Sequence, residues 1–186
     1  MSAPLFLQTL IPEDSGGEAV SVLRINISKL SEGTHHHSLQ ATPVEVGLDE
    51  CFNKDVRIEA TLEKTSRQLF LRANIKTGGR FTCDRCLEDF ESEVTSEYSL
   101  VYVTDDRRVA GGSDEIQVIS PAANHIDLGE DVRQFTVLAL PQKMLCREDC
   151  AGLCPTCGTN LNRATCACQK EELDPRWSGL QKFLKN

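Results

Sequence analysis

The sequence lacks the features that mark membrane proteins, fibrous proteins and the best-known enzyme families. None of its apolar runs approaches the roughly 18 residues that a membrane-spanning helix needs. Gly contributes only 12 and Pro only seven of the 186 residues, which excludes a collagen-like or low-complexity chain. The phosphate-binding glycine loops, the G-x-S-x-G nucleophile motif and the H-E-x-x-H zinc-protease motif are all missing. We therefore predict a globular protein that is not an enzyme, with no membrane contact and no small-molecule substrate.

An export signal is also missing from the start of the chain. The first 17 residues contain no Lys or Arg and no apolar segment of the kind that a secretory signal requires. We therefore expect a cytoplasmic protein. In that compartment, grouped cysteines serve as metal ligands or redox thiols more often than as structural disulfides.

Positive charge is scarce, and the acidic residues are unevenly distributed. The net charge of −8 argues against non-specific nucleic-acid binding, which depends on neutralising phosphates. Positions 83–131 hold 13 acidic and three basic residues, whereas positions 132–186 hold five acidic and eight basic residues. The acidic block is either a solvated face or a surface for a basic partner protein.

Alternation of apolar and polar residues predicts antiparallel strands in the first two thirds of the chain. Every second residue is apolar in 56–63 and in 69–76, which is typical of strands with one buried face. Residues 64–67 and the pair Gly78-Gly79 are expected to form hairpin turns. A strand is expected near 20–27 and a weaker one at 40–46, with residues 29–50 otherwise irregular. Together these segments predict a meander of about five or six strands.

One clear helix is predicted after the strands. From Leu128 to Ala139, apolar residues recur every three or four positions, which places them on one helical face. Asp127 is expected to cap the first turn, and Pro141 to end the helix. We divide the chain into a leader (1–17), a domain of antiparallel sheet plus helix (18–140), and a cysteine-rich segment with a C-terminal helix (141–186). That last helix is predicted from Asp174-Pro175, and its apolar stripe suits either the core or a partner.

Eight of the nine cysteines form four close pairs. The pair in Cys154-Pro155-Thr156-Cys157-Gly158 is spaced C-x2-C, which brings two thiolates onto one ion and is a strong zinc-knuckle signal. The first choice of partner for this pair is the C-x-C pair formed by Cys166 and Cys168. A site made of Cys154, Cys157, Cys166 and Cys168 would be closed to water and therefore structural rather than catalytic.

The remaining pairs leave two alternatives open. The C-x3-C pair of Cys146 and Cys150 is close enough in sequence to complete a site with Cys154 and Cys157. Alternatively, a second site combines two distant pairs and fastens the sheet to the cysteine-rich segment. The residues of that second site are Cys83, Cys86, Cys146 and Cys150. We predict at least one structural Zn2+ and consider two.

Other candidate sites are weaker. The triplet His35-His36-His37 lies in a segment that is expected to be a polar loop, where a solvated loop is favoured over a metal site. Cys51 stands alone beside Phe52 and is expected to be a buried thiol rather than a nucleophile.

Several short motifs follow one another in a fixed order within residues 83–180. They are Cys83-Asp84-Arg85-Cys86-Leu87, Ile126-Asp127-Leu128, Leu138-Ala139-Leu140-Pro141, Cys146-Arg147-Glu148-Asp149-Cys150, Gly152-Leu153-Cys154-Pro155-Thr156-Cys157-Gly158, Asn160-Leu161-Asn162 and Asp174-Pro175-Arg176-Trp177. Together these motifs resemble the YceD family of bacterial proteins, which is linked to the accumulation of 23S ribosomal RNA. The resemblance implies a role in synthesis, processing or stability of 23S rRNA and in large-subunit assembly, without a known reaction or catalytic residues.

The implied partners are an rRNA precursor or a basic large-subunit ribosomal protein. We hypothesise that the acidic block holds the basic protein, while basic residues near the zinc contact phosphate; these are Lys143, Arg147, Arg163 and Lys170. Two other hypotheses remain: a zinc-thiol redox sensor, and a zinc-ribbon adaptor in transcription or translation. The predicted fold class is α+β, an antiparallel sheet or partly closed barrel covered by a helix and followed by a zinc-binding C-terminal segment.

Overall fold

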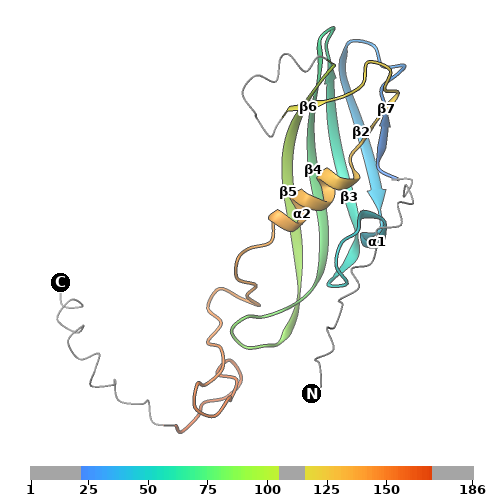
Figure 1. The fold of residues 1–186 in the computed structure, drawn as a ribbon. Helices are drawn as coiled ribbons and strands as arrows, with labels where there is room; N and C mark the ends of the chain where they lie inside the picture. Colours follow the sequence, from blue (N-terminus) through green and yellow to red (C-terminus); the bar gives the residue numbers. More distant parts are fainter. Residues whose placement is uncertain (1–21, 105–115, 169–186) are drawn as a thin grey trace, which may run out of the picture.

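Strands dominate the computed structural model of the chain, which describes residues 22–104 and 116–168 (Figure 1). Within those ranges the chain forms seven strands and two helices. In chain order they are β1 (Arg24–Asn26), β2 (Gly33–Ala41), α1 (Pro43–Val46), β3 (Phe52–Lys64), β4 (Gln68–Thr82), β5 (Asp89–Val103), β6 (Ile116–Val118), β7 (His125–Asp127) and α2 (Gly129–Leu138).

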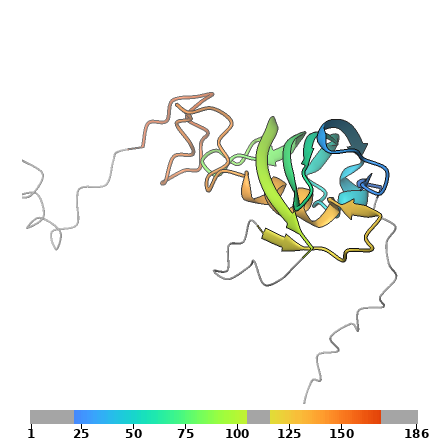
Figure 2. The same cartoon turned by 90° about the horizontal axis from the view of Figure 1, so that it is seen from above.

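The main sheet has the strand order β2-β3-β4-β5-β6. Its first four strands are antiparallel neighbours, and β6 adds to β5 in parallel. The short strands β1 and β7 pair separately as a two-stranded sheet. Seen along the strands in Figure 2, the main sheet curves but stays open. The predicted sheet is thus present in its coarse form, mostly antiparallel with few helices, and it is not a closed barrel.

The apolar residues that alternate along the strands form the core, as predicted. Val56, Ile58 and Leu62 of β3 are each 0% exposed, while their neighbours in the sequence face outward. The apolar residues of β4 and β5 continue the same inner face. Since each strand contributes every second side chain, this single buried face follows from period-two patterning alone.

Helix α2 packs against β5 through an aromatic pair. The rings of Tyr98 and Phe135 stack with centroids 4.5 Å apart, and the Ser96 hydroxyl donates to the Phe135 carbonyl at 3.0 Å. The helix begins at Gly129, one residue after the predicted start at Leu128, because Asp127 ends β7 and Leu128 is the N-cap. The Asp127 carboxylate still accepts the Gly129 N–H at 2.9 Å, so it binds a free N–H group at the helix start as expected.

The prediction for residues 29–50 was wrong. Strand β2 occupies Gly33–Ala41, and residues 43–46 form the short helix α1 rather than a strand. Thr42 begins α1 with a capping box, in which its hydroxyl accepts the Glu45 N–H while the Glu45 carboxylate accepts the Thr42 N–H. The Thr-x-x-Glu pattern is the sequence signal of such a cap.

The prediction of a hairpin turn at Gly78-Gly79 was also wrong, because β4 runs straight through both glycines. Gly79 lies against the start of β3, where a Cβ atom would stand only 2.2 Å from the Cys51 carbonyl oxygen. That carbonyl accepts the N–H of Arg80 at 2.8 Å. Gly79 therefore permits a close approach of two backbones, which is the other common reason for glycine in a strand.

Some predictions lie outside the described residues, namely the leader (1–17) and the C-terminal helix from Asp174. The boundary between a sheet domain and a cysteine-rich segment at residue 140 stays a prediction. In 22–104 and 116–168, neither helix has the length and apolar character that crossing a membrane requires.

Candidate metal centre

The turn between β4 and β5 and the segment after α2 together form a cluster of four cysteines. The sulfur atoms of Cys83, Cys86, Cys146 and Cys150 all lie within 4.8 Å of one another. Two of the separations are 3.8 Å (Cys83 to Cys150) and 3.7 Å (Cys86 to Cys146). A tetrahedron with metal–sulfur bonds of ~2.3 Å has edges of about 3.8 Å, so the four sulfurs fit around a zinc ion. We call this the sheet cluster.

A second cluster follows directly in the chain. The sulfur atoms of Cys154, Cys157, Cys166 and Cys168 also lie within 4.8 Å of one another. This outer cluster is less enclosed, because Cys157 is exposed whereas three cysteines of the sheet cluster are buried. Cys146 and Cys150 therefore group with the distant pair on the sheet and not with Cys154 and Cys157.

Each cluster contains one turn of the same backbone geometry. In the first turn, the Cys83 N–H donates to the Glu88 carbonyl and the Leu87 N–H donates to the Cys83 carbonyl, both at 2.9 Å. In the second turn, the Cys154 N–H donates to Thr159 at 2.8 Å and the Gly158 N–H donates to Cys154 at 2.9 Å. The residue after the second cysteine has a positive φ in both turns. The C-x2-C spacing thus forms the same knuckle twice.

The segment after α2 is tied to the first knuckle by backbone and side-chain bonds. Asp84 and Met144 exchange two hydrogen bonds, one through the Asp84 N–H (2.8 Å) and one through its carboxylate (2.7 Å). The Arg85 guanidinium donates to the carbonyls of Cys150 (3.0 Å) and Glu148 (3.3 Å). These contacts hold the C-x3-C loop over the knuckle, at the end of the long strands (Figure 1).

Asn162 joins the two clusters. Its side-chain N–H donates to the Cys150 sulfur at 3.3 Å, and its side-chain oxygen accepts from Arg147 (2.7 Å) and from the Ala151 N–H (2.8 Å). Asn162 itself lies between the two cysteine pairs of the outer cluster. A residue of the outer segment thereby positions a ligand of the sheet cluster.

The thiols of each cluster have divergent acidities. The Cys146 N–H lowers the pKa of Cys83 to about 6, and the Cys157 N–H does the same for Cys154. Burial raises the pKa of Cys146 well above its usual range, and a hydrogen bond with Cys157 raises that of Cys168. Each cluster therefore combines thiols of lowered and of raised pKa, and deprotonation of all four requires a cation among the sulfurs.

Five described carboxylates on or beside β5 are paired with cations. Glu91, Glu93 and Glu97 point outward from β5, opposite the basic side chains of β3 and β4. The ion pairs are Glu88–Arg163 (2.8 Å), Asp89–Arg80 (3.1 Å), Glu91–Lys54 (3.2 Å), Glu93–Lys76 (3.3 Å) and Glu97–Arg72 (3.8 Å). The outer face of β5 is therefore a charge-matched ladder rather than an uncompensated acidic surface.

The histidine triplet lies in β2 and not in a loop, so that prediction was wrong. Neighbouring residues of a strand point to opposite faces, which prevents the three imidazoles from meeting on one ion. His36 contacts the Thr61 hydroxyl at 3.1 Å, while burial lowers the pKa of His37. Cys51 is a half-buried free thiol, less enclosed than expected, and burial raises its pKa.

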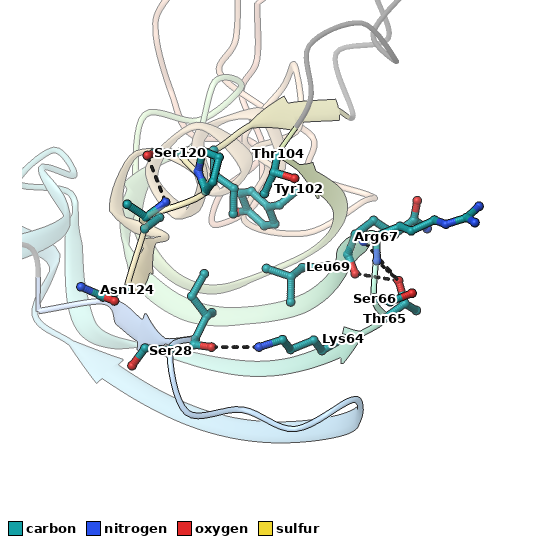
Figure 3. A pocket seen from close by; sticks show the side chains of 16 residues that line it. Ser28, Lys64, Thr65, Ser66, Arg67, Leu69, Tyr102, Thr104, Ser120 and Asn124 are labelled. Atoms are coloured by element: carbon teal, nitrogen blue, oxygen red, sulfur yellow. Dashed lines mark hydrogen bonds between the residues drawn. The ribbon is translucent and has the colours of Figure 1, made fainter.

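A polar cavity of about 380 Å³ lies at the other end of the strands (Figure 3). Lys64 lines it, but its ammonium group donates to the carbonyls of Ile27 (3.2 Å) and Leu30 (2.8 Å). The amine thus fastens the end of β1 to β3 and is already partnered on the cavity side.

Sequence reasoning proposed every cysteine of the two clusters but missed the residues that position them. The roles of Asp84 and Asn162 were not predicted, although both belong to motifs that the sequence displays. A signal for Asn162 was present, because an Asn beside a cysteine-rich loop is suited to donate to sulfur.

Comparison of the sequence with known proteins identifies distant relatives. The family model described as "Large ribosomal RNA subunit accumulation protein YceD" matches residues 71–184. Uncharacterised proteins of Mycobacterium tuberculosis and Mycobacterium bovis are each 26% identical over 155 residues, covering 80% of this chain and 72% of theirs. The "Large ribosomal RNA subunit accumulation protein YCED homolog 1, chloroplastic" of Arabidopsis thaliana is 22% identical over 186 residues, covering 84% of this chain and 58% of the plant protein. No solved structure gives a significant match.

Proposed function

This chain belongs to the YceD family of large ribosomal RNA subunit accumulation proteins, and we propose that it supports 23S rRNA and large-subunit assembly without catalysing a reaction. The observation that carries the proposal is the family match over residues 71–184, a range that includes both cysteine clusters and both knuckles. Membership makes a role in rRNA accumulation the function to test.

Both clusters are proposed to hold a structural Zn2+. The donor set supports zinc, since four thiolates at tetrahedral spacing are typical of structural zinc sites. A bound ion would supply the positive charge that lets all four thiols deprotonate. The chain's own residues do the rest: the knuckle N–H groups orient Cys83 and Cys154, and Arg85 and Asn162 hold the Cys150 loop.

The proposed role is that of a binding factor. Metal in the sheet cluster would fix the segment after α2 to the end of β4 and β5, because that cluster takes two ligands from each side. The outcome is a rigid projection at one end of an open sheet. We propose that this end contacts a component of the maturing large subunit, and that the protein acts in the bacterial cytoplasm.

The first prediction concerns rRNA levels in cells. Removal of the gene is expected to lower the ratio of 23S to 16S rRNA, measured by quantitative northern blotting with a precursor-specific probe. The wild-type gene should restore the ratio. A Cys83→Ser/Cys86→Ser variant should not, because it removes half of the sheet cluster.

Cys51→Ser is the matched control, since Cys51 belongs to neither cluster, and it is expected to restore the ratio fully. An unchanged ratio in cells without the gene would contradict the proposed function. Full rescue by the double variant would instead leave that function standing and remove the sheet cluster from it.

A further inference from the structure

Leu87 occupies a position in the first knuckle at which glycine is the usual residue. It follows the second cysteine, with φ +59°, and the equivalent residue of the second knuckle is Gly158, with φ +73°. A positive φ brings a Cβ atom close to the following backbone, which is unfavourable for every residue with a side chain and especially for a bulky one. The backbone of Leu87 is therefore strained, whereas a glycine at this position would not be.

The Leu87 side chain is also exposed to solvent, with 66% of its surface accessible. The bond that closes the turn comes from the backbone N–H of this residue, and Gly158 makes the same bond without any side chain. Folding thus gains little burial from the leucine side chain. Strain combined with exposure is expected where a residue serves binding rather than stability.

We propose that Leu87 is the anchor of a docking surface for a basic protein of the large ribosomal subunit. This inference rests on the proposed function and adds to it the site of contact and the class of partner. The docking surface consists of Leu87 with two exposed acidic residues, Asp84 of the same knuckle and Glu148 of the loop that Arg85 binds. An exposed leucine contributes to binding when a partner offers an apolar pocket that removes it from water.

The charges around Leu87 favour a basic partner. Asp84 and Glu148 are exposed, and no cation of the described residues lies within 4 Å of their carboxylates in a salt bridge. The one base inside the knuckle, Arg85, is engaged with the carbonyls of Cys150 and Glu148. A zinc ion with four thiolates would add further negative charge beneath this surface.

The same features argue against direct contact with RNA at this end of the molecule. Proteins read unpaired RNA by stacking aromatic rings or guanidinium groups on bases, and an aliphatic side chain offers neither. Uncompensated carboxylates repel phosphates. The surface is therefore assigned to a protein and not to the rRNA itself.

The test separates binding from stability. In Leu87→Gly the backbone strain is relieved, as Gly158 shows, so the thermal midpoint should stay unchanged or rise while binding falls at least tenfold. Leu87→Asn, which tolerates a positive φ, should behave the same way, and Leu87→Met should retain binding. The matched control is Val44→Ser, because Val44 of α1 is 86% exposed and lies on another element.

The probes are the individually purified proteins of the large ribosomal subunit and, separately, naked 23S rRNA. We expect one basic protein to bind the wild type and the Val44→Ser and Leu87→Met variants, with affinity measured by fluorescence anisotropy. Equal binding by Leu87→Asn would overturn the inference, as would loss of rRNA binding in that variant. Sedimentation velocity gives a further outcome: loss of self-association in Leu87→Asn would assign the surface to a second copy of the chain instead.

Failure of the inference is distinguishable from failure of the proposed function. Cells that carry Leu87→Asn in place of the wild-type gene are expected to show the lowered 23S to 16S ratio. If the deletion lowers the ratio and Leu87→Asn restores it, the proposed function stands and the docking surface falls. If the deletion leaves the ratio unchanged, the proposed function falls whatever Leu87 binds.

Discussion

At the scale of single residues, the sulfur atoms of the clusters depend on hydrogen bonds that hold them in position. Asn162 donates to the Cys150 sulfur, and its side-chain oxygen binds the loop that carries that cysteine. Partners of this kind fix the orientation of a metal ligand and tune its electron donation. Asn162 is therefore a positioning residue for the sheet cluster, although its own place in the chain is between the cysteine pairs of the outer one.

The variant Asn162→Ala is expected to lower the metal affinity of the sheet cluster by about 10- to 100-fold, because Cys150 loses its N–H donor. Titration with Co2+ measures this loss and also reports the thiolate-to-cobalt charge-transfer band, which should shift when an N–H···S bond is removed. A merely structural role would change the affinity and leave the band in place.

Asn74→Ala serves as the control, since Asn74 is exposed on β4 and belongs to neither cluster. It should leave both the affinity and the band unchanged. An unaltered band in Asn162→Ala would show that the sulfur does not depend on this donor.

At the scale of elements, the sequence patterns that succeeded were local ones. Alternation over 56–63 and 69–76 identified β3 and β4 because one buried face requires a period of two. The turn predicted at Gly78-Gly79 was wrong because a glycine pair is typical either of a turn or of a close approach between two backbones. Only the position of Cys51 in the fold shows that the second reason applies here. Strand β2 at residues 33–41 was not predicted, since this His-rich segment lacks a clear alternation of apolar and polar residues.

In the candidate site, too, the sequence predicts local features better than contacts between distant residues. The short spacing of Cys154 and Cys157 predicted one knuckle, and the equal spacing of Cys83 and Cys86 forms a second one, because each knuckle is closed by bonds between near neighbours. Which pair completes which cluster is set by the contact of the first knuckle with the segment after α2, some sixty residues away (Cys86 to Cys146). Several partners satisfy the spacing alone, so the sequence left that choice open.

Gly79→Ala tests the close approach of β3 and β4. The new Cβ atom would stand 2.2 Å from the Cys51 carbonyl oxygen, which is backbone and has no freedom to rotate away. We expect a loss of about 2–3 kcal/mol in the free energy of unfolding, measured by urea denaturation.

The comparison for this prediction is Gly78→Ala, whose Cβ atom meets the flexible end of the Lys54 side chain at 2.9 Å and the Ser92 carbonyl at 3.0 Å. This substitution should cost less, about 1 kcal/mol, because Lys54 rotates aside. Equal losses in the two variants would show that the glycines act through their flexibility and not through the contact with Cys51.

At the scale of the whole molecule, the sheet has a core of its own and the cysteine-rich segment does not. The buried apolar residues of the main core belong to the strands, α1, α2 and the loops beside them. The three buried members of the second core, in contrast, are all cysteines: Cys83, Cys86 and Cys150. Metal binding contributes about 10–16 kcal/mol to small zinc-finger peptides. A free energy of that size would determine whether residues 144–168 fold.

Two zinc ions per chain are therefore expected in protein purified without chelator, as measured by elemental analysis. On titration with a chelator, the outer cluster should lose its ion first, because Cys157 is exposed while Cys83, Cys86 and Cys150 are buried. Loss of the second ion should make residues 144–168 sensitive to protease while the far-ultraviolet signal of the strands persists, because the sheet core contains no metal ligand.

The Cys166→Ser/Cys168→Ser variant isolates the sheet cluster and should bind one ion. Simultaneous release of both ions, together with melting of the sheet, would show instead that sheet and segment form a single folding unit, and it would remove the boundary predicted at residue 140.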